Sequence, residues 1–257
     1  AGRDYNAGGA RYNTSYIQGV GLGTITDALV ALKVHVYDRR TVGMARFIEI
    51  LQDNFEGHED FRRLLLDDTP KYGNDDDAAD GIMQRVFEAY FQAVDGRPNT
   101  RGGVHRINLL PTTCHVYFGS VIGALPDGRK AGVALSEGIS PVQGMDRNGP
   151  TAVTRSAAKL DHIRTGGTLL NQKFLPQVLA DDTGIAKLAQ LVRTYFRMDG
   201  HHIQFNVVDG RTLRRARQHP DDYRDLIVRV AGYSDYFVDL TEELQDEIVR
   251  RTEHELA

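Results

Sequence analysis

Residues 119–150 form a long irregular stretch in the middle of the chain, and any fold of this sequence has to accommodate it. The stretch is rich in Gly, Pro, Asp and Ser, and neither a helical nor a strand period runs through it. A loop of this length inside a compact domain is usually either functional or disordered. Because hydrophobic residues recur along it, we expect an ordered loop that joins two regions of regular structure.

Helical periodicity dominates the region before this stretch. Apolar residues recur at three- and four-residue spacing after Thr24, after Thr41 and within 82–91, and each run predicts a helix. The acidic residues 75–77 predict the N-terminus of the third helix, where negative charge suits the helix dipole. Residues 1–23 are expected to form a loop that ends in a glycine-rich run.

Strand patterns are shorter and lie mainly in the second half of the chain. Residues 107–109 and 115–118 predict extended segments on either side of Pro111. The alternation in 203–207 predicts a strand with one polar face, and the apolar run 226–230 predicts a strand buried on both faces. Two further helices are expected, and the residues that can cap them are Thr183 and Thr241. Helices that alternate with few strands indicate an α/β fold.

The composition argues against several functions. The chain has 257 residues, with 31 Lys and Arg against 35 Asp and Glu, whereas nucleic-acid binding needs clustered positive charge. No apolar run approaches the roughly 18 residues of a membrane helix, and no secretory leader opens the chain. The single cysteine, Cys114, excludes an intrachain disulfide, so we expect a cytoplasmic protein.

Residues 229–237, RVAGYSDYF, are the most informative segment. From the residues alone, a buried strand runs into Gly232 and continues through an aromatic-rich loop to a helix. The simplest interpretation is that Gly232 supplies a turn that other residues cannot adopt. Metal binding is not predicted, because the following histidines lack the spacing of metal ligands: His201, His202 and His219.

The same segment closely resembles the signature of glycyl radical enzymes, the superfamily of pyruvate formate-lyase and of glycerol and choline lyases. Further matching motifs follow one another in order: GGARYN at 8–13, IQGVGLGTITDAL at 17–29, PDGRKAG at 126–132, SEGISPVQGMDRNGPTAV at 136–153, GGTLLNQKF at 166–174 and HIQFNVV at 202–208. The resemblance implies the C-terminal part of a ten-stranded α/β barrel with surrounding helices. Residues 1–125 would belong to the barrel domain and residues 126–257 to the glycyl radical domain.

The resemblance also implies that Gly232 carries an organic radical used in anaerobic metabolism. A Cα radical is stabilised by delocalisation over the amide nitrogen and the carbonyl when the backbone is planar, and a Cβ substituent would strain that planarity. The other motif residues form the radical loop, in which apolar and aromatic groups are expected to exclude solvent and oxygen: Arg229, Val230, Ala231, Tyr233, Ser234, Tyr236 and Phe237.

No bound cofactor is expected. The hydrogen atom would be removed by a separate activating enzyme that uses S-adenosylmethionine and an iron–sulfur cluster. One cysteine in this chain cannot supply the usual ligands of such a cluster.

In the family the radical passes to a cysteine that is followed by a Val-Glu or similar pair. Cys114 is followed by His115 and Val116, so we interpret it as a small buried hydrophobic residue. The thiyl cysteine is then expected upstream of Ala1, which is itself not an initiator Met, and this chain alone is expected to be inactive. The rival interpretation is a non-catalytic spare part that replaces an oxygen-damaged glycyl radical domain, against which the barrel-like sequence at 1–125 argues.

Arg106 is the one candidate for substrate binding. A guanidinium is suited to bidentate binding of a sulfonate or carboxylate, and the segment resembles that of lyases that cleave the C–S bond of isethionate and release sulfite. An arginine at the rim that pairs with a carboxylate is an equally weighted alternative. The other lyases to consider are choline trimethylamine-lyase and a diol or hydroxyproline dehydratase. The full-length protein is expected to be a homodimer, in the cytoplasm or in a bacterial microcompartment, acting on a small molecule.

Overall fold

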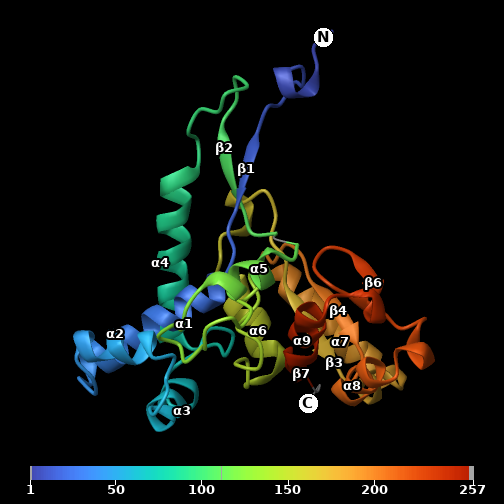
Figure 1. Cartoon of the computed structure of the whole chain (residues 1–257). Coiled ribbons are helices and arrows are strands. Elements are labelled where there is room, and N and C mark those ends of the chain that lie inside the picture. Colours follow the sequence, from blue (N-terminus) through green and yellow to red (C-terminus); the bar gives the residue numbers. More distant parts are fainter. Residues whose placement is uncertain (1, 111, 255–257) are drawn as a thin grey trace.

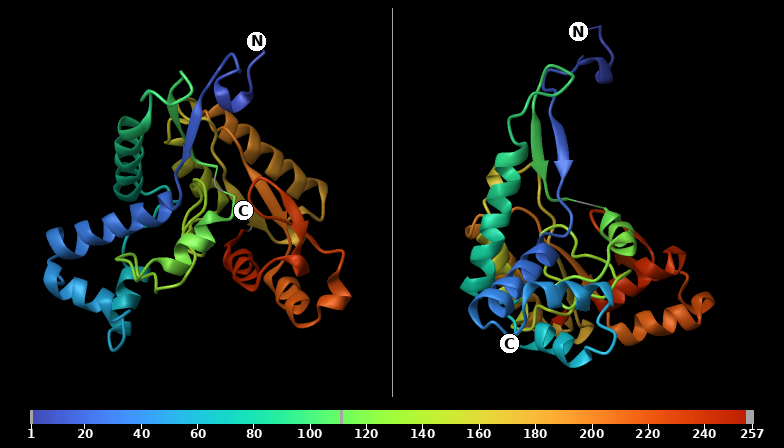
Figure 2. Two further views of the ribbon diagram at one scale, coloured as in Figure 1. Left: turned by 45° about the horizontal axis from the view of Figure 1, so that its top comes forward. Right: turned by 60° about the vertical axis from the view of Figure 1, so that its left-hand side comes forward.

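The computed structural model describes residues 2–110 and 112–254 and has the mixed α/β architecture that the sequence predicts (Figure 1). Helices α1 to α4 lie on one side of the molecule, and the elements from α7 onward lie on the other (Figures 1 and 2). Two residues named in the sequence predictions, Ala1 and Pro111, lie outside the described residues.

The first side of the molecule is built from four helices: α1 (Leu22–Leu32), α2 (Met44–Gln52), α3 (Glu59–Asp67) and α4 (Asp77–Val94). The Asp76 side chain accepts hydrogen bonds from the N–H groups of Ala78 and Ala79, so the acidic cluster caps α4 as predicted. Helix α1 packs against α4. Its apolar residues Ile25 and Leu29 nevertheless remain 44% and 36% exposed, while Leu22 and Val30 are buried together with small and polar residues.

Parallel pairing links strands that are far apart in the sequence. Strand β1 (Ser15–Gln18) pairs with β2 (His105–Asn108), so the loop predicted for residues 1–23 is wrong at this point. Side chains along β1 are mostly exposed, and its partner lies far along the chain, so no local period marks it. A parallel bridge from Leu109 to Thr168 then leads to β3 (Asn171–Phe174), which pairs with β4 (Gln204–Val207) and with β7 (Glu253–His254).

The second side of the molecule surrounds β3 and β4 with helices. These are α7 (Asp182–Arg197), α8 (Gly210–Gln218) and α9 (Glu242–Arg250). A separate antiparallel hairpin is formed by β5 (Ile227–Arg229) and β6 (Ser234–Tyr236). The hairpin contributes to a hydrophobic core with the helices: Val208, Leu213, Ala216, Val228, Val230, Phe237, Leu244 and Ile248.

The extended segment predicted at 115–118 is wrong, because helix α5 (Cys114–Val121) occupies this position. His115 and Gly119 are its two buried residues, one helical turn apart. A Cβ at Gly119 would overlap the carbonyl oxygen of Val133, so the glycine allows the helix to approach the following chain. The aromatic residues that favoured a strand are instead exposed on the outer face of the helix.

Residues 122–148 form neither helix nor strand, and they run between the two sides up to α6 (Gly149–Ala158) (Figure 2). The segment is ordered by packing, as its sequence predicts. Ile139 is fully buried, and reciprocal hydrogen bonds join Ser136 to Thr24 of α1 at 3.0 and 2.8 Å. This irregular segment therefore positions the helices of the first side against the sheet of the second.

Candidate functional site

Gly232 lies at the tip of the β5–β6 hairpin. The N–H of Val230 donates to the carbonyl of Tyr233 at 2.9 Å and closes the turn around Gly232. The φ angle of Gly232 is +79°, in the left-handed region that favours glycine. A Cβ at this position would meet only Leu169 Cδ1, at an ordinary 3.7 Å, so the requirement for glycine is conformational and not a matter of space.

The surroundings of the hairpin differ from the sequence prediction. The segment after Gly232 forms strand β6 and not a loop leading directly into a helix. Ile227 is 59% exposed, so β5 is not buried on both faces. Gly232 and residues 233–236 are likewise exposed in the chain described, because only one side of the short hairpin packs on the core. Tyr233 and Tyr236 are exposed in this chain, so their shielding of the radical stays a prediction, while Phe237 is buried as expected.

Arg229 joins both ends of the turn through one guanidinium group. Its Nη2 donates to the carbonyl oxygen of Gly232 at 3.1 Å, and its Nε donates to Gln204 Oε1 at 2.9 Å. A third contact runs from Nη1 to Ser234 Oγ at 3.3 Å. Two residues of the predicted radical loop, Arg229 and Ser234, are thus brought together around Gly232.

The polar face of β4 is the buried face, and it holds the hairpin. Gln204 Oε1 accepts from the N–H of Gly232 at 3.2 Å. Asn206 forms a reciprocal pair with the backbone of Arg229, accepting from its N–H and donating to its carbonyl, both at 2.7 Å. Sequence reasoning did not assign these two amides to the site. The signal was present, because polar side chains that alternate along an interior strand need partners there.

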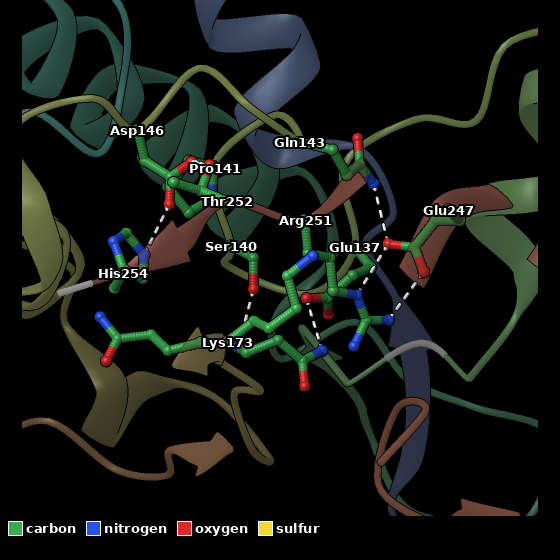
Figure 3. A pocket seen from close by; sticks show the side chains of 12 residues that line it. Glu137, Ser140, Pro141, Gln143, Asp146, Lys173, Glu247, Arg251, Thr252 and His254 are labelled. Atoms are coloured by element: carbon green, nitrogen blue, oxygen red, sulfur yellow. Dashed lines mark hydrogen bonds and ion pairs between the residues drawn. The ribbon is translucent and has the colours of Figure 1, made fainter. Parts of the chain in front are cut away.

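A buried ion pair supports the hairpin from the side of α9 (Figure 3). Arg251 donates to the carbonyl oxygens of Arg229 and Val230 at 3.2 and 3.0 Å. The same guanidinium contacts both carboxylate oxygens of Glu247 at 3.0 and 2.8 Å. Burial opposes ionisation of Glu247, but the charge of Arg251 outweighs it and holds the pKa of Glu247 well below its usual range.

Arg106 and Cys114 lie on other elements. Arg106 is on β2, its side chain is 39% exposed, and its Nε contacts Asp95 Oδ1 at 2.6 Å. This contact is the pairing with a carboxylate that was one of the two interpretations of Arg106. Cys114 is exposed at the start of α5, so its interpretation as a buried hydrophobic residue is wrong.

Membrane-spanning helices and metal sites are both missing from the described part of the chain. Within residues 2–110 and 112–254, no helix combines the length and the apolarity needed to cross a membrane. Over the same ranges, no group of three or more His, Cys, Asp or Glu residues is arranged to hold a metal ion.

Comparisons with known families match most of the chain. Residues 1–119 match the family model described as pyruvate formate lyase-like, and residues 135–238 match the model described as glycine radical. The second match contains Gly232 and Gln204, the β4 residue that accepts from its N–H.

Individual relatives agree with the family models. The chain is 58% identical over 252 residues to trans-4-hydroxy-L-proline dehydratase of Clostridioides difficile, covering 98% of this chain and 32% of the relative. It is 41% identical over 248 residues to isethionate sulfite-lyase of Bilophila wadsworthia, covering 95% of this chain and 30% of the relative.

A solved structure shows the same arrangement. The crystal structure of the hydroxyproline dehydratase of Clostridioides difficile with bound substrate matches 99% of this chain and 32% of its own, with a TM-score of 0.96 and 58% identity. The chain thus spans about a third of the length of the relatives that it matches. With both family models matched in order and the fold shared, the chain belongs to the glycyl radical enzymes.

Proposed function

We propose that Gly232 carries the radical and that this chain is the radical-bearing portion of a dehydratase or lyase. The observation that supports this most is the construction of the hairpin. Gly232 is held at its N–H by Gln204 and at its carbonyl by Arg229, while its Cα lies at the exposed tip.

The proposed activation is a homolytic step. The Cα–H bond of Gly232 breaks, the hydrogen atom leaves to a radical generated from S-adenosylmethionine on the separate activating enzyme, and one electron stays on Cα. Delocalisation over both neighbouring peptide groups requires them to become coplanar. The φ angle then moves from +79° toward the extended region, a change that glycine permits.

We propose that the radical then passes to a cysteine outside this chain. Cys114, exposed on α5 and followed by His115, lacks the sequence pattern of the thiyl cysteine. The chain spans about a third of its relatives, so substrate hydrogen abstraction and elimination would require the remaining part. The proposed domain boundary lies near residue 125, inside the irregular segment between α5 and α6.

Dehydration of trans-4-hydroxy-L-proline is the substrate assignment that the comparisons favour. The chain is 58% identical to the hydroxyproline dehydratase and 41% identical to the isethionate sulfite-lyase. Isethionate was the substrate that the sequence around Arg106 indicated. Both substrates carry an anionic group, a carboxylate or a sulfonate. Arg106 is proposed to contact this group, with the Asp95 carboxylate fixing the orientation of its guanidinium.

Anaerobic activation of the complete protein tests both parts of this proposal. A doublet-type electron paramagnetic resonance signal is expected, and Gly232→Ala should abolish it. A signal that persists in the variant would refute the radical site. Product analysis with trans-4-hydroxy-L-proline, isethionate, choline and glycerol tests the substrate: turnover of hydroxyproline alone is expected, and sulfite release from isethionate would favour the alternative.

A further inference from the structure

A continuous line of hydrogen bonds leads from the backbone of Gly232 into the protein interior. The Gly232 N–H donates to Gln204 Oε1 at 3.2 Å, and Gln204 Nε2 donates to Asn171 Oδ1. Asn171 Nδ2 in turn donates to Glu137 Oε1 at 2.6 Å. All three side chains are buried, although they come from β4, β3 and the irregular segment.

The direction of this line is fixed by chemistry. Gln204 Oε1 faces two donors, the Gly232 N–H and Arg229 Nε, so the opposite amide orientation would place donors against donors. The NH₂ group of Gln204 therefore faces Asn171 Oδ1, and the NH₂ group of Asn171 faces the Glu137 carboxyl group. Every donor points away from Gly232 and toward Glu137.

Glu137 ends the line in a polar cavity that also contains the Arg251–Glu247 pair (Figure 3). Burial raises the pKa of Glu137, while the charge of Arg251 lowers it. The second carboxyl oxygen, Oε2, is buried without a hydrogen-bond partner among the described residues. Burial of a carboxyl group is costly, and the hydrogen bond from Asn171 offsets part of that cost at Oε1.

Resting on the proposed radical at Gly232, we propose that Gln204, Asn171 and Glu137 are positioning residues that fix the Gly232 amide and raise its electron density. Hydrogen bonds aligned in one direction polarise one another in a low-dielectric interior. An acceptor at the N–H makes the amide nitrogen a better electron donor to a radical on Cα. The Arg229 guanidinium at the carbonyl oxygen withdraws density on the other side of Cα.

The geometry of the φ rotation separates these two contacts. The N–H of Gly232 belongs to the peptide group before the rotating bond, so it remains against Gln204 when φ changes. The carbonyl of Gly232 lies beyond that bond and leaves its position against Arg229. When the radical becomes planar, Gly232 therefore keeps its hydrogen bond to Gln204, which is the first bond of the line to Glu137.

This role also accounts for three motifs that the radical loop leaves unexplained. Glu137 lies in the SEGISP motif, Asn171 in GGTLLNQKF and Gln204 in HIQFNVV. These segments are distant in the sequence, and the line of side chains joins all three of them to the backbone of Gly232.

The test uses the complete, anaerobically activated protein and compares Gln204→Leu and Asn171→Leu with Asn206→Leu. Asn206 is a matched control, because it lies on the same face of β4 and bonds the backbone of Arg229 but not Gly232. Loss of the line is expected to change the hyperfine splitting of the radical signal. It is also expected to lower the number of spins per chain about fivefold, the effect of one hydrogen bond. Asn206→Leu should keep the parent splitting.

Parent-like splitting in both Gln204→Leu and Asn171→Leu would overturn the proposal, as would an identical change in Asn206→Leu. If a leucine variant unfolds, Glu137→Gln decides, because it keeps the shape and an oxygen acceptor but replaces the carboxyl group with an amide. A shifted splitting supports the proposal, and an unchanged one overturns it. Absence of a signal in the parent protein would instead refute the radical at Gly232, and the proposal with it.

Discussion

At the scale of single residues, two independent reasons favour glycine at position 232. One is its left-handed backbone conformation, and the other is the radical chemistry proposed for it. Its φ of +79° costs a residue with a Cβ roughly 1–2 kcal/mol. The space around the position is open, since a Cβ added there would lie 3.7 Å from its nearest neighbouring atom. A side chain here would therefore strain the turn without disrupting the core.

Gly232→Ala is accordingly expected to lower the free energy of unfolding by about 1–2 kcal/mol, the cost of the left-handed conformation. Chemical denaturation of the complete protein measures this change. A loss of stability several times larger would mean that absence of the radical in the variant reflects misfolding rather than removal of the radical site.

Asp27 gives a second prediction at this scale. It is buried on α1 and accepts a hydrogen bond from the N–H of Tyr72 at 2.8 Å. Burial raises the pKa of Asp27 from 3.8 to about 7, against the opposing charge of Lys71. The folded state therefore favours the protonated form, whose contribution to stability is present below about pH 4 and is lost as the pH rises through about 7.

Asp27→Asn keeps an oxygen acceptor for Tyr72 but cannot ionise. The variant is expected to lose less stability than the parent protein between about pH 4 and about pH 7 in denaturation experiments. Equal pH dependence in the two proteins would show that Asp27 does not titrate in this range.

At the scale of elements, Arg251, the residue that follows helix α9, supports the hairpin. Arg251 contacts two successive carbonyl groups of the strand that leads into Gly232, and Glu247 neutralises it in the interior. Removal of one member of a buried ion pair leaves an unpaired charge, whereas removal of both members is often close to neutral.

Arg251→Met is therefore expected to cost about 3–5 kcal/mol of stability, and the double variant with Glu247→Leu should recover much of that loss. Hydrogen exchange should become faster in the hairpin, residues 227–236, in both variants, because both lack the guanidinium that holds it. Unchanged hydrogen exchange in the hairpin would show that Arg251 does not support it.

Local patterns explain which elements were predictable from the sequence. Helix α4 has a helical apolar period and an N-terminal cap, and strand β4 has an alternating pattern of apolar and polar residues. Both elements were therefore predicted from the sequence. Strand β1 depends on a parallel partner about 90 residues away. Helix α5 contains β-branched and aromatic residues that favour a strand, and only His115 and Gly119 are buried in it. The motif located the Gly232 segment, but its contacts with Gln204 and Arg251 arise from tertiary pairing that no local pattern encodes.

At the scale of the whole molecule, the chain combines a helical side, an irregular segment and the hairpin-bearing side (Figure 2). It spans about a third of its relatives, and the proposed thiyl cysteine lies outside it. A radical formed at Gly232 would then have no cysteine of the family pattern to receive it within this chain.

This chain alone, mixed with the activating enzyme and trans-4-hydroxy-L-proline, is expected to give no product, whereas the complete protein turns the substrate over. Adding the chain to the complete Gly232→Ala enzyme tests the spare-part interpretation. No recovery of product is expected, and restored turnover would favour a repair module.

The most direct measurement of the radical site is the position at which oxygen cuts the activated protein. A radical on Gly232 Cα reacts with oxygen at that atom, and cleavage of the backbone follows there. Mass spectrometry after brief exposure to air is expected to detect a new C-terminal fragment that begins at Gly232 or immediately after it. An intact chain, or a cut at another residue, would contradict the assignment of the radical to Gly232.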